Sequence, residues 1–124
     1  SEAENFYVSS KQINTLQESG MIVGSHAVSH RMFSQLSVAD QAREIQNSFD
    51  FLDSVTGGLE FRTFCFPYGG SDSFNSESER LLDEAGCSFS FKVEPRNITA
   101  EDLTERRQAL PRFDCNRFRY GQVR

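Results

Sequence analysis

The most regular hydrophobic pattern in the sequence lies between residues 37 and 58. Apolar side chains recur there at spacings of four and three, as on one face of an amphipathic helix, at Val38, Ala42, Ile45, Phe49 and Leu52. Ser37 precedes this face as a candidate N-cap, and Asp40 follows three residues later in a box-like start. Gly57 and Gly58 close the pattern. These residues predict one long helix.

Shorter helices are predicted from their capping residues. Each follows a serine or threonine whose side chain can accept a hydrogen bond from the first turn, and the first two stop at Gly20 and Gly86. They cover residues 11–19 after Ser10, residues 77–85 after Ser76, and one or two turns after Thr99.

Short apolar or alternating segments between these helices predict strands at residues 21–24, 61–66, 87–93 and 109–113. Strands that alternate with helices are typical of an α/β domain with a mainly parallel sheet. With 124 residues the chain has room for one domain, assigned to residues 1–124, with a basic tail over residues 115–124. About four strands are too few to close a barrel, which needs around eight. We therefore expect exposed sheet edges unless another segment or chain covers them.

Charge and composition exclude several classes of protein. The net charge of −5 argues against nucleic acid as the main partner. No apolar run approaches the roughly 20 residues of a membrane-spanning helix. Three scattered cysteines without a Cys-x-x-Cys pair suggest neither a zinc ribbon nor a disulfide scaffold. The carboxy-terminal part is rich in arginine, which indicates either a solvated tail or a patch for an acidic glycan or an acidic segment of the parent protein.

The only two histidines of the chain, His26 and His30, lie four residues apart and follow the predicted strand at 21–24. In a helix this spacing would place both imidazoles on one face. Neutral imidazole is a good ligand for zinc and similar metals, and α/β folds place their sites at strand ends. Ala27 stands where the helical zinc-protease motif has its glutamate, so that motif is excluded. The alternative is a histidine pair that binds no metal.

Residues 64–70, Phe-Cys-Phe-Pro-Tyr-Gly-Gly, end the next predicted strand in a turn. The proline fixes φ, and the glycines permit close approach of the backbone. Backbone N–H groups in such a turn can stabilise an oxyanion. Taken alone, a Pro-Tyr-Gly segment is usually just an ordinary turn.

Together the two segments resemble the polysaccharide deacetylase domain, also called the NodB-homology domain or carbohydrate esterase family 4. The resemblance rests on residues 24–30, Gly-Ser-His-Ala-Val-Ser-His, and on Phe-Pro-Tyr-Gly at 66–69. Residues 13–24, which lead into the first histidine, also look like the helix and strand at that place in the family. Leu-Pro-Arg at 110–112 looks like a segment found late in many members. The resemblance implies a partial (β/α) barrel that removes acetyl groups from a polysaccharide or glycan, in a chain that looks bacterial.

The resemblance also implies a division of roles. In that family an aspartate and two histidines hold a divalent metal, usually zinc, which polarises the acetyl carbonyl and activates water. A carboxylate serves as general base and a late histidine protonates the leaving amine. Carried over to this sequence, His26 and His30 are the metal ligands, and Tyr68 lines the site with its backbone N–H in the oxyanion hole.

The sequence departs from the family pattern in several places. No Asp-Asp pair occurs, although the family takes its base and third metal ligand from one, and no late histidine is left over. Cys65 stands where many members have an arginine, and Arg62 would face the other side of the strand. We expect either a longer enzyme, whose missing N-terminal segment or a second chain completes the barrel, or a degenerate module that binds glycan without cutting it. A third alternative is a small α/β protein whose histidines are incidental. The substrate glycan and the cellular location are not legible.

Overall fold

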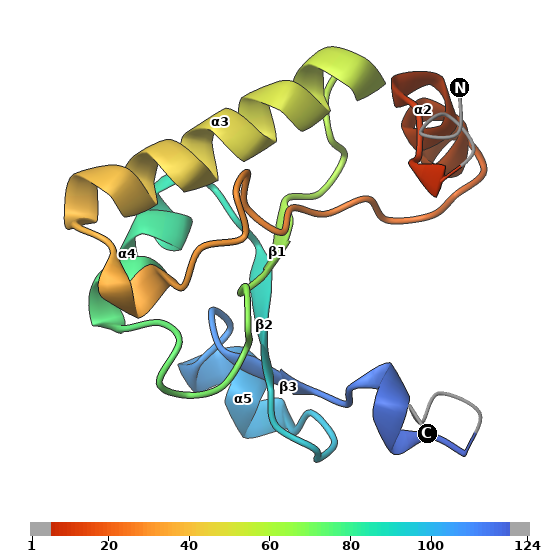
Figure 1. Cartoon of the computed structure of the whole chain (residues 1–124). Coiled ribbons are helices and arrows are strands. Elements are labelled where there is room, and N and C mark those ends of the chain that lie inside the picture. Colours follow the sequence, from red (N-terminus) through yellow and green to blue (C-terminus); the bar gives the residue numbers. More distant parts are fainter. Residues whose placement is uncertain (1–5, 120–124) are drawn as a thin grey trace.

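The computed structural model describes residues 6–119 and contains a three-stranded parallel sheet (Figure 1). The strands are β1 (Thr63–Cys65), β2 (Phe89–Val93) and β3 (Leu110–Arg112), in the order β1-β2-β3. Thr63 pairs with Phe89 between β1 and β2, and Phe91 pairs with Leu110 between β2 and β3. The sheet is parallel throughout, so the carboxyl ends of all three strands meet at one edge. This confirms the predicted α/β class.

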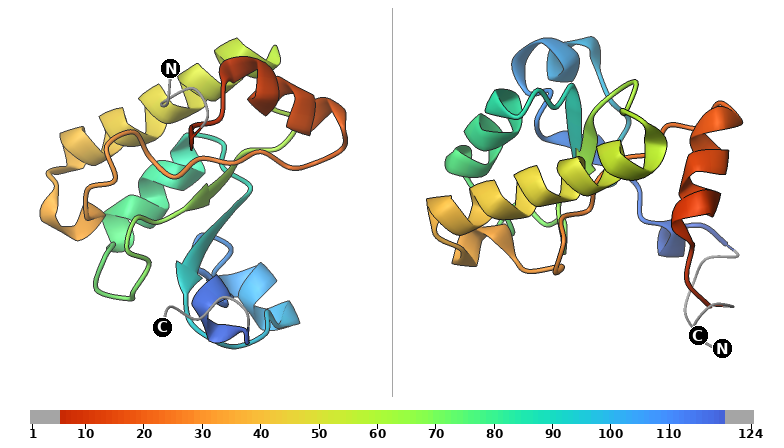
Figure 2. Two further views of the ribbon diagram at one scale, coloured as in Figure 1. Left: turned by 45° about the vertical axis from the view of Figure 1, so that its right-hand side comes forward. Right: turned by 90° about the horizontal axis from the view of Figure 1, so that it is seen from above.

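Helices connect the strands. They are α2 (Ser10–Glu18), α3 (Val38–Thr56), α4 (Ser76–Glu84) and α5 (Ala100–Glu105), with short 3-10 helices η1 (Phe33–Gln35) and η2 (Cys115–Arg117). Figures 1 and 2 show α3 and α4 side by side over one face of the sheet, and α2 beside the carboxyl end of α3. No helix within residues 6–119 has both the length and the apolar character needed to cross a membrane.

The helices begin at side-chain caps. Ser37 caps α3 by accepting from the N–H of Asp40, and Thr99 caps α5 in a capping box with Asp102, both as predicted. The other two caps lie one residue earlier than predicted, at Ser9 for α2 and Asn75 for α4. In each case the residue three positions on, Gln12 or Ser78, completes a capping box.

The predicted strand at residues 21–24 is the main correction to the fold. This segment is extended but joins the sheet only by an isolated bridge, in which Ser25 donates to Thr63 O at 2.8 Å and accepts from the Cys65 N–H at 2.9 Å. Gly24 permits the approach, since a Cβ there would lie 2.3 Å from Thr63 Oγ1. The other three predicted strands exist but are shorter.

Phenylalanine dominates the core between the sheet and the two covering helices. Phe33, Phe49, Phe64 and Phe66 are at most 1% exposed. Phe66 stacks on Phe74 with ring centroids 4.1 Å apart. Strand β1 therefore directs alternate side chains into this core, which leaves the opposite face of the strand for its other residues.

The arginine-rich carboxy-terminal part is largely neutralised where the structure describes it. Arg106 pairs with Glu79, Arg107 with Asp83, and Arg112 with Asp114. Residues 120–124 of the predicted basic tail lie outside the described residues. The three cysteines are free thiols.

Candidate functional site

The structure brings together the three residues that the sequence singles out. The ring centroids of His26 and His30 are 4.9 Å apart, and those of His30 and Tyr68 are also 4.9 Å apart. His26 directly follows the Ser25 bridge, and Tyr68 follows β1 by three residues. All three side chains are exposed. The candidate site is therefore an open surface at the carboxyl end of the sheet.

The two histidines do not meet by sharing a helical face. The segment between them is irregular, and both Ala27 (φ 64°) and His30 (φ 55°) have left-handed backbone. Tyr68 (φ 69°) is the third and last non-glycine residue with positive φ among residues 6–119. Such conformations are unfavourable for residues with a Cβ and persist where the surroundings enforce them, often at functional sites. All three lie within this one site.

Serines hold the beginning of the histidine loop against α3. The Ser25 hydroxyl lies 2.6 Å from the Ser48 hydroxyl, and both serines are buried. The N–H of Ala27 donates to Ser25 Oγ at 3.1 Å. Ser48 is anchored in turn by donating to Ile45 O within α3. This chain of hydrogen bonds fixes the backbone immediately on either side of His26.

The centre of the loop is held by a carboxylate. Glu44, on α3, accepts from the N–H groups of Val28 (2.8 Å) and Ser29 (3.1 Å) and from the Ser29 hydroxyl. Partial burial acts to raise the pKa of Glu44, but the hydrogen bonds from Ser29 and Val28 and the charge of Arg31 together bring it below its ordinary value of 4.5. An ionised Glu44 therefore stabilises the turn that joins the two histidines.

A hydrogen bond also orients the His26 ring. Its Nδ1 lies 2.7 Å from the carbonyl oxygen of Cys65. Because a carbonyl oxygen only accepts, Nδ1 must carry the proton, and the lone pair of the neutral ring is then on Nε2. Histidines that bind metals usually have their other ring nitrogen held in this way. The arrangement leaves Nε2 of His26 available as a ligand.

The pair of imidazoles fits one divalent cation in part. Two imidazoles bound to one tetrahedral zinc at about 2.0–2.1 Å per Zn–N bond would have ring centroids roughly 5 Å apart, close to the observed separation. Catalytic zinc normally has three protein ligands, however. Among residues 6–119 no group of three or more histidine, cysteine, aspartate or glutamate side chains is arranged to hold a metal. The described residues thus supply two ligands and lack a third.

Tyr68 lies in a turn that is packed tightly onto β2. Pro67 before it is fully buried, and Gly69 after it has φ 82°. The Val93 N–H donates to Gly69 O at 2.7 Å. A Cβ at Gly69 would lie only 2.4 Å from Val93 Cγ2. The side chain of Tyr68 is 61% exposed, so this turn fixes the backbone of Tyr68 more firmly than its ring.

The site continues into a pocket of about 450 Å³, which includes His26, Thr63, Cys65, Phe91 and Arg112 in its lining. Burial raises the pKa of the Cys65 thiol, against a weaker opposing effect of the Arg112 charge. The sequence did not identify Arg112, Glu44 or Ser48 as site residues. Only Arg112 carried a signal, as part of the Leu-Pro-Arg segment, and the two α3 residues are recognisable solely from contacts 15 or more positions apart in the chain.

Arg62 is directed away from this site, as the sequence predicted. It donates to Ala85 O and to Asp53, and its guanidinium carbon lies 5.1 Å from the centre of the Phe49 ring. These partners belong to the helix-covered side of the sheet. Arg62 therefore does not replace the arginine that is absent at Cys65.

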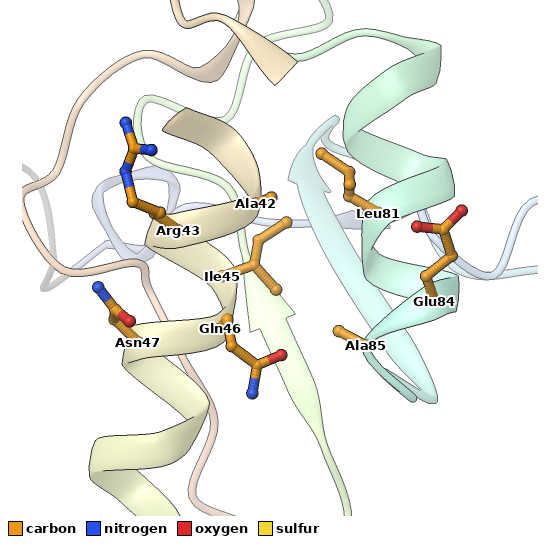
Figure 3. A pocket seen from close by; sticks show the side chains of 8 residues that line it. All are labelled: Ala42, Arg43, Ile45, Gln46, Asn47, Leu81, Glu84 and Ala85. Atoms are coloured by element: carbon orange, nitrogen blue, oxygen red, sulfur yellow. The ribbon is translucent and has the colours of Figure 1, made fainter. Parts of the chain in front are cut away.

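A second pocket, of about 380 Å³, lies between α3 and α4 (Figure 3). Figure 3 shows Ile45 of α3 and Leu81 of α4 facing each other across it, with the charged groups of Arg43 and Glu84 at its outer side. Neither histidine nor Tyr68 contributes to its lining. We regard it as a gap between packed helices, separate from the candidate site.

Comparison with known proteins agrees with this arrangement. A family model described as polysaccharide deacetylase matches residues 2–90, which include His26, His30 and Tyr68. No curated protein matches the chain significantly.

Several solved structures are similar in fold. The deacetylase PplD of Streptococcus pyogenes, in complex with acetate, is 20% identical, with a TM-score of 0.75 over 86% of this chain and 44% of its own. A family 4 carbohydrate esterase from Streptomyces lividans, also in complex with acetate, is 20% identical, with a TM-score of 0.59 over 77% of this chain and 45% of its own. A mutant of a CE4-family pseudoenzyme is 18% identical, with a TM-score of 0.57 over 65% of this chain and 28% of its own. The chain thus spans less than half of each of these proteins.

Proposed function

The chain belongs to the polysaccharide deacetylase family, and on that premise we propose that it forms part of the catalytic domain of a hydrolase that removes acetyl groups from a polysaccharide or glycan. The observation that carries the proposal is the convergence of His26, His30 and Tyr68, from two separate segments, on one point at the carboxyl end of the sheet. The carbohydrate class of the substrate follows from the family.

We assign His26 and His30 as ligands of a divalent metal, with zinc as the best match for two imidazoles. When bound, such a metal acts as a Lewis acid on a carbonyl and lowers the pKa of bound water. His26 would bind through Nε2, because Nδ1 is committed to the carbonyl of Cys65. A carboxylate from outside the described residues would supply the third ligand, because residues 6–119 offer none beside the two rings.

The proposed role of Tyr68 is carried by its backbone. Its left-handed conformation and the tight packing of Gly69 on Val93 give the turn a single geometry. An N–H group held in this way needs no reorganisation when negative charge develops on the carbonyl oxygen of a bound acetyl group. We therefore assign the Tyr68 N–H to the oxyanion hole and its ring to the wall of the site beside His30.

An assay of acetate release tests the proposal. The complete protein is incubated with acetylated glycan oligosaccharides, with and without a metal chelator, alongside a His26→Ala variant. We expect both the chelator and the substitution to reduce release by about a hundredfold or more, since each removes the metal's contribution of several kcal/mol. Arg107→Gln is the matched control, because Arg107 is a surface residue paired with Asp83. Full activity in the His26→Ala protein would refute the ligand assignment.

A non-catalytic glycan-binding module is the second candidate function. It is favoured by the lack of a third metal ligand in the described residues and by the similarity to the fold of a pseudoenzyme. Binding of the same oligosaccharides without acetate release, by a protein confirmed to contain metal, would support this candidate over the hydrolase.

A further inference from the structure

The histidine loop, residues 26–30, is attached to α3 at two points. Near its beginning, the hydroxyl of Ser48 on α3 lies 2.6 Å from that of Ser25. Just before its end, Glu44 on α3 accepts hydrogen bonds from two backbone N–H groups. Helix residues four apart lie on the same face, one turn from each other. The helix therefore presents two anchors to the loop from a single face.

The contact between the two serines has a definite direction. Ser48 donates its only hydroxyl proton to Ile45 O at 2.8 Å, so the hydrogen bond between the hydroxyls is donated by Ser25. Ser25 Oγ in turn accepts from the Ala27 N–H at 3.1 Å. Both serines are at most 5% exposed. A buried hydroxyl that loses its partner is costly, so the relay from Ala27 through both serines to the helix backbone resists disruption.

These anchors support the strained parts of the loop. Ala27, directly after His26, has φ 64°, a left-handed conformation that is unfavourable for a residue with a Cβ. The bond from its N–H to Ser25 offsets part of that cost. Glu44 supports the second left-handed residue, His30 (φ 55°), through the N–H groups of the two residues before it. Each anchor therefore holds one left-handed residue at or beside a candidate metal ligand.

We propose that α3 sets the separation of the two imidazoles, with Ser48 as a positioning residue for His26 and Glu44 as a positioning residue for His30. The inference rests on the proposed function for the purpose of this separation, because ring centroids 4.9 Å apart suit two ligands of one cation. Both α3 side chains act through the backbone of the loop. Removing a group that orients metal ligands typically lowers metal affinity about 10–100-fold.

Nuclear magnetic resonance of the whole chain, first without metal, tests the inference. The observable is the nuclear Overhauser cross-peak between the ring protons of His26 and His30, whose rings are in contact. We expect it in the unsubstituted chain and expect Ser48→Ala and Glu44→Gln each to lose most of it. Zinc is then added in a Cys115→Ser background, because that thiol is exposed. Each variant should raise the zinc midpoint about tenfold or more.

The same helix offers a matched control for each variant. Ser54 donates to a carbonyl oxygen three residues back in α3, as Ser48 does, but from an exposed position. Asp50 is a carboxylate like Glu44, and it accepts from Gln46 of the same helix. Ser54→Ala and Asp50→Asn should therefore keep both the cross-peak and the zinc midpoint of the unsubstituted chain.

Several results would overturn the inference. They are an unsubstituted chain that shows no cross-peak, Ser48→Ala and Glu44→Gln variants that keep it, and controls that lose it equally. Should Ser48→Ala not fold, Glu44→Gln decides the matter, because its side chain is only half-buried.

The two readouts separate this inference from the proposed function. An unsubstituted chain that shows the cross-peak but binds no zinc would refute the assignment of the metal ligands, and the cross-peaks of the variants would still decide the role of α3. A chain that binds zinc with one midpoint, unchanged in Ser48→Ala and in Glu44→Gln, would sink the role of α3 and leave the metal ligands standing.

Discussion

Glu44 illustrates how a single side chain outside the two recognised motifs shapes the candidate site. Its carboxylate accepts hydrogen bonds from two backbone N–H groups and one hydroxyl in the loop between His26 and His30. Ala27 and His30 in that loop have left-handed backbone, which the loop sequence alone does not favour. We infer that Glu44 maintains the distance between the two imidazoles.

Glu44→Gln should therefore destabilise the chain in a pH-dependent way. The folded state lowers the pKa of Glu44, so the unfolded chain takes up its proton first as the pH falls. The stabilisation is fully present above the unfolded value of about 4.5 and is lost as the pH falls through the lower folded value. Urea unfolding should show a loss of about 1 kcal/mol at pH 7 that shrinks below pH 4.5. A difference that stays constant down to pH 3 would contradict this role.

The Tyr68 side chain should matter less than the His26 side chain, because the proposed donor of Tyr68 is its backbone N–H and its ring is exposed. Tyr68→Ala keeps the N–H group and is expected to lower acetate release by less than about tenfold, well short of the loss in His26→Ala. The comparison uses one acetate-release assay at equal protein and metal concentrations. A loss in Tyr68→Ala as complete as in His26→Ala would show that the side chain, and not the backbone, is required.

At the scale of elements, the sequence predicts the helices well because their signals are local. Ile45, Phe49 and Leu52 of the predicted apolar face are buried and the Ser37 cap is confirmed, whereas Val38 at the start of that face is exposed. The capping errors at Ser9 and Asn75 amount to one residue each. The place of residues 21–24 beside the sheet could not be predicted from sequence, because it depends on the contact between Gly24 and Thr63, 39 positions apart. The hydrogen bond between His26 and Cys65 spans the same number of positions. The histidine loop was unpredictable for a similar reason, since α3 imposes its left-handed residues.

Gly69, in the turn after β1, and Gly57, at the C-cap of α3, form a matched pair that separates backbone strain from crowding. Gly69 and Gly57 have similar φ angles, 82° and 76°, but only Gly69 would place a Cβ against a neighbour, Val93. Gly57→Ala should cost about 1–2 kcal/mol, from the left-handed conformation alone. Gly69→Ala should cost about 1–3 kcal/mol more, from overpacking. Urea unfolding of both variants measures the difference, and equal losses would contradict the packing of this turn on β2.

For the molecule as a whole, the sequence was sufficient for the α/β class and for the pairing of the histidine and tyrosine segments. It was not sufficient for the electrostatic surroundings. Three of the carboxy-terminal arginines are neutralised by acids of α4 or of the following segment, and Arg112 reaches the pocket from the strand farthest from β1. The acids that pair with Arg106 and Arg107 lie 27 and 24 positions away in the chain, so no local pattern predicted them. Arg112 instead pairs with Asp114, two positions on.

The central claim is that His26 and His30 hold one divalent cation between them. The chain has only these two histidines, so its imidazole resonances report on them alone. We propose a zinc titration at pH 7, followed by nuclear magnetic resonance in a Cys115→Ser background, because the exposed thiol of Cys115 would also bind zinc. Both imidazoles should shift together with one midpoint, and His30→Ala should move the midpoint for His26 at least about tenfold higher, as expected for loss of one ligand. Two imidazoles that titrate with separate midpoints, or a His26 midpoint unchanged in His30→Ala, would contradict the account.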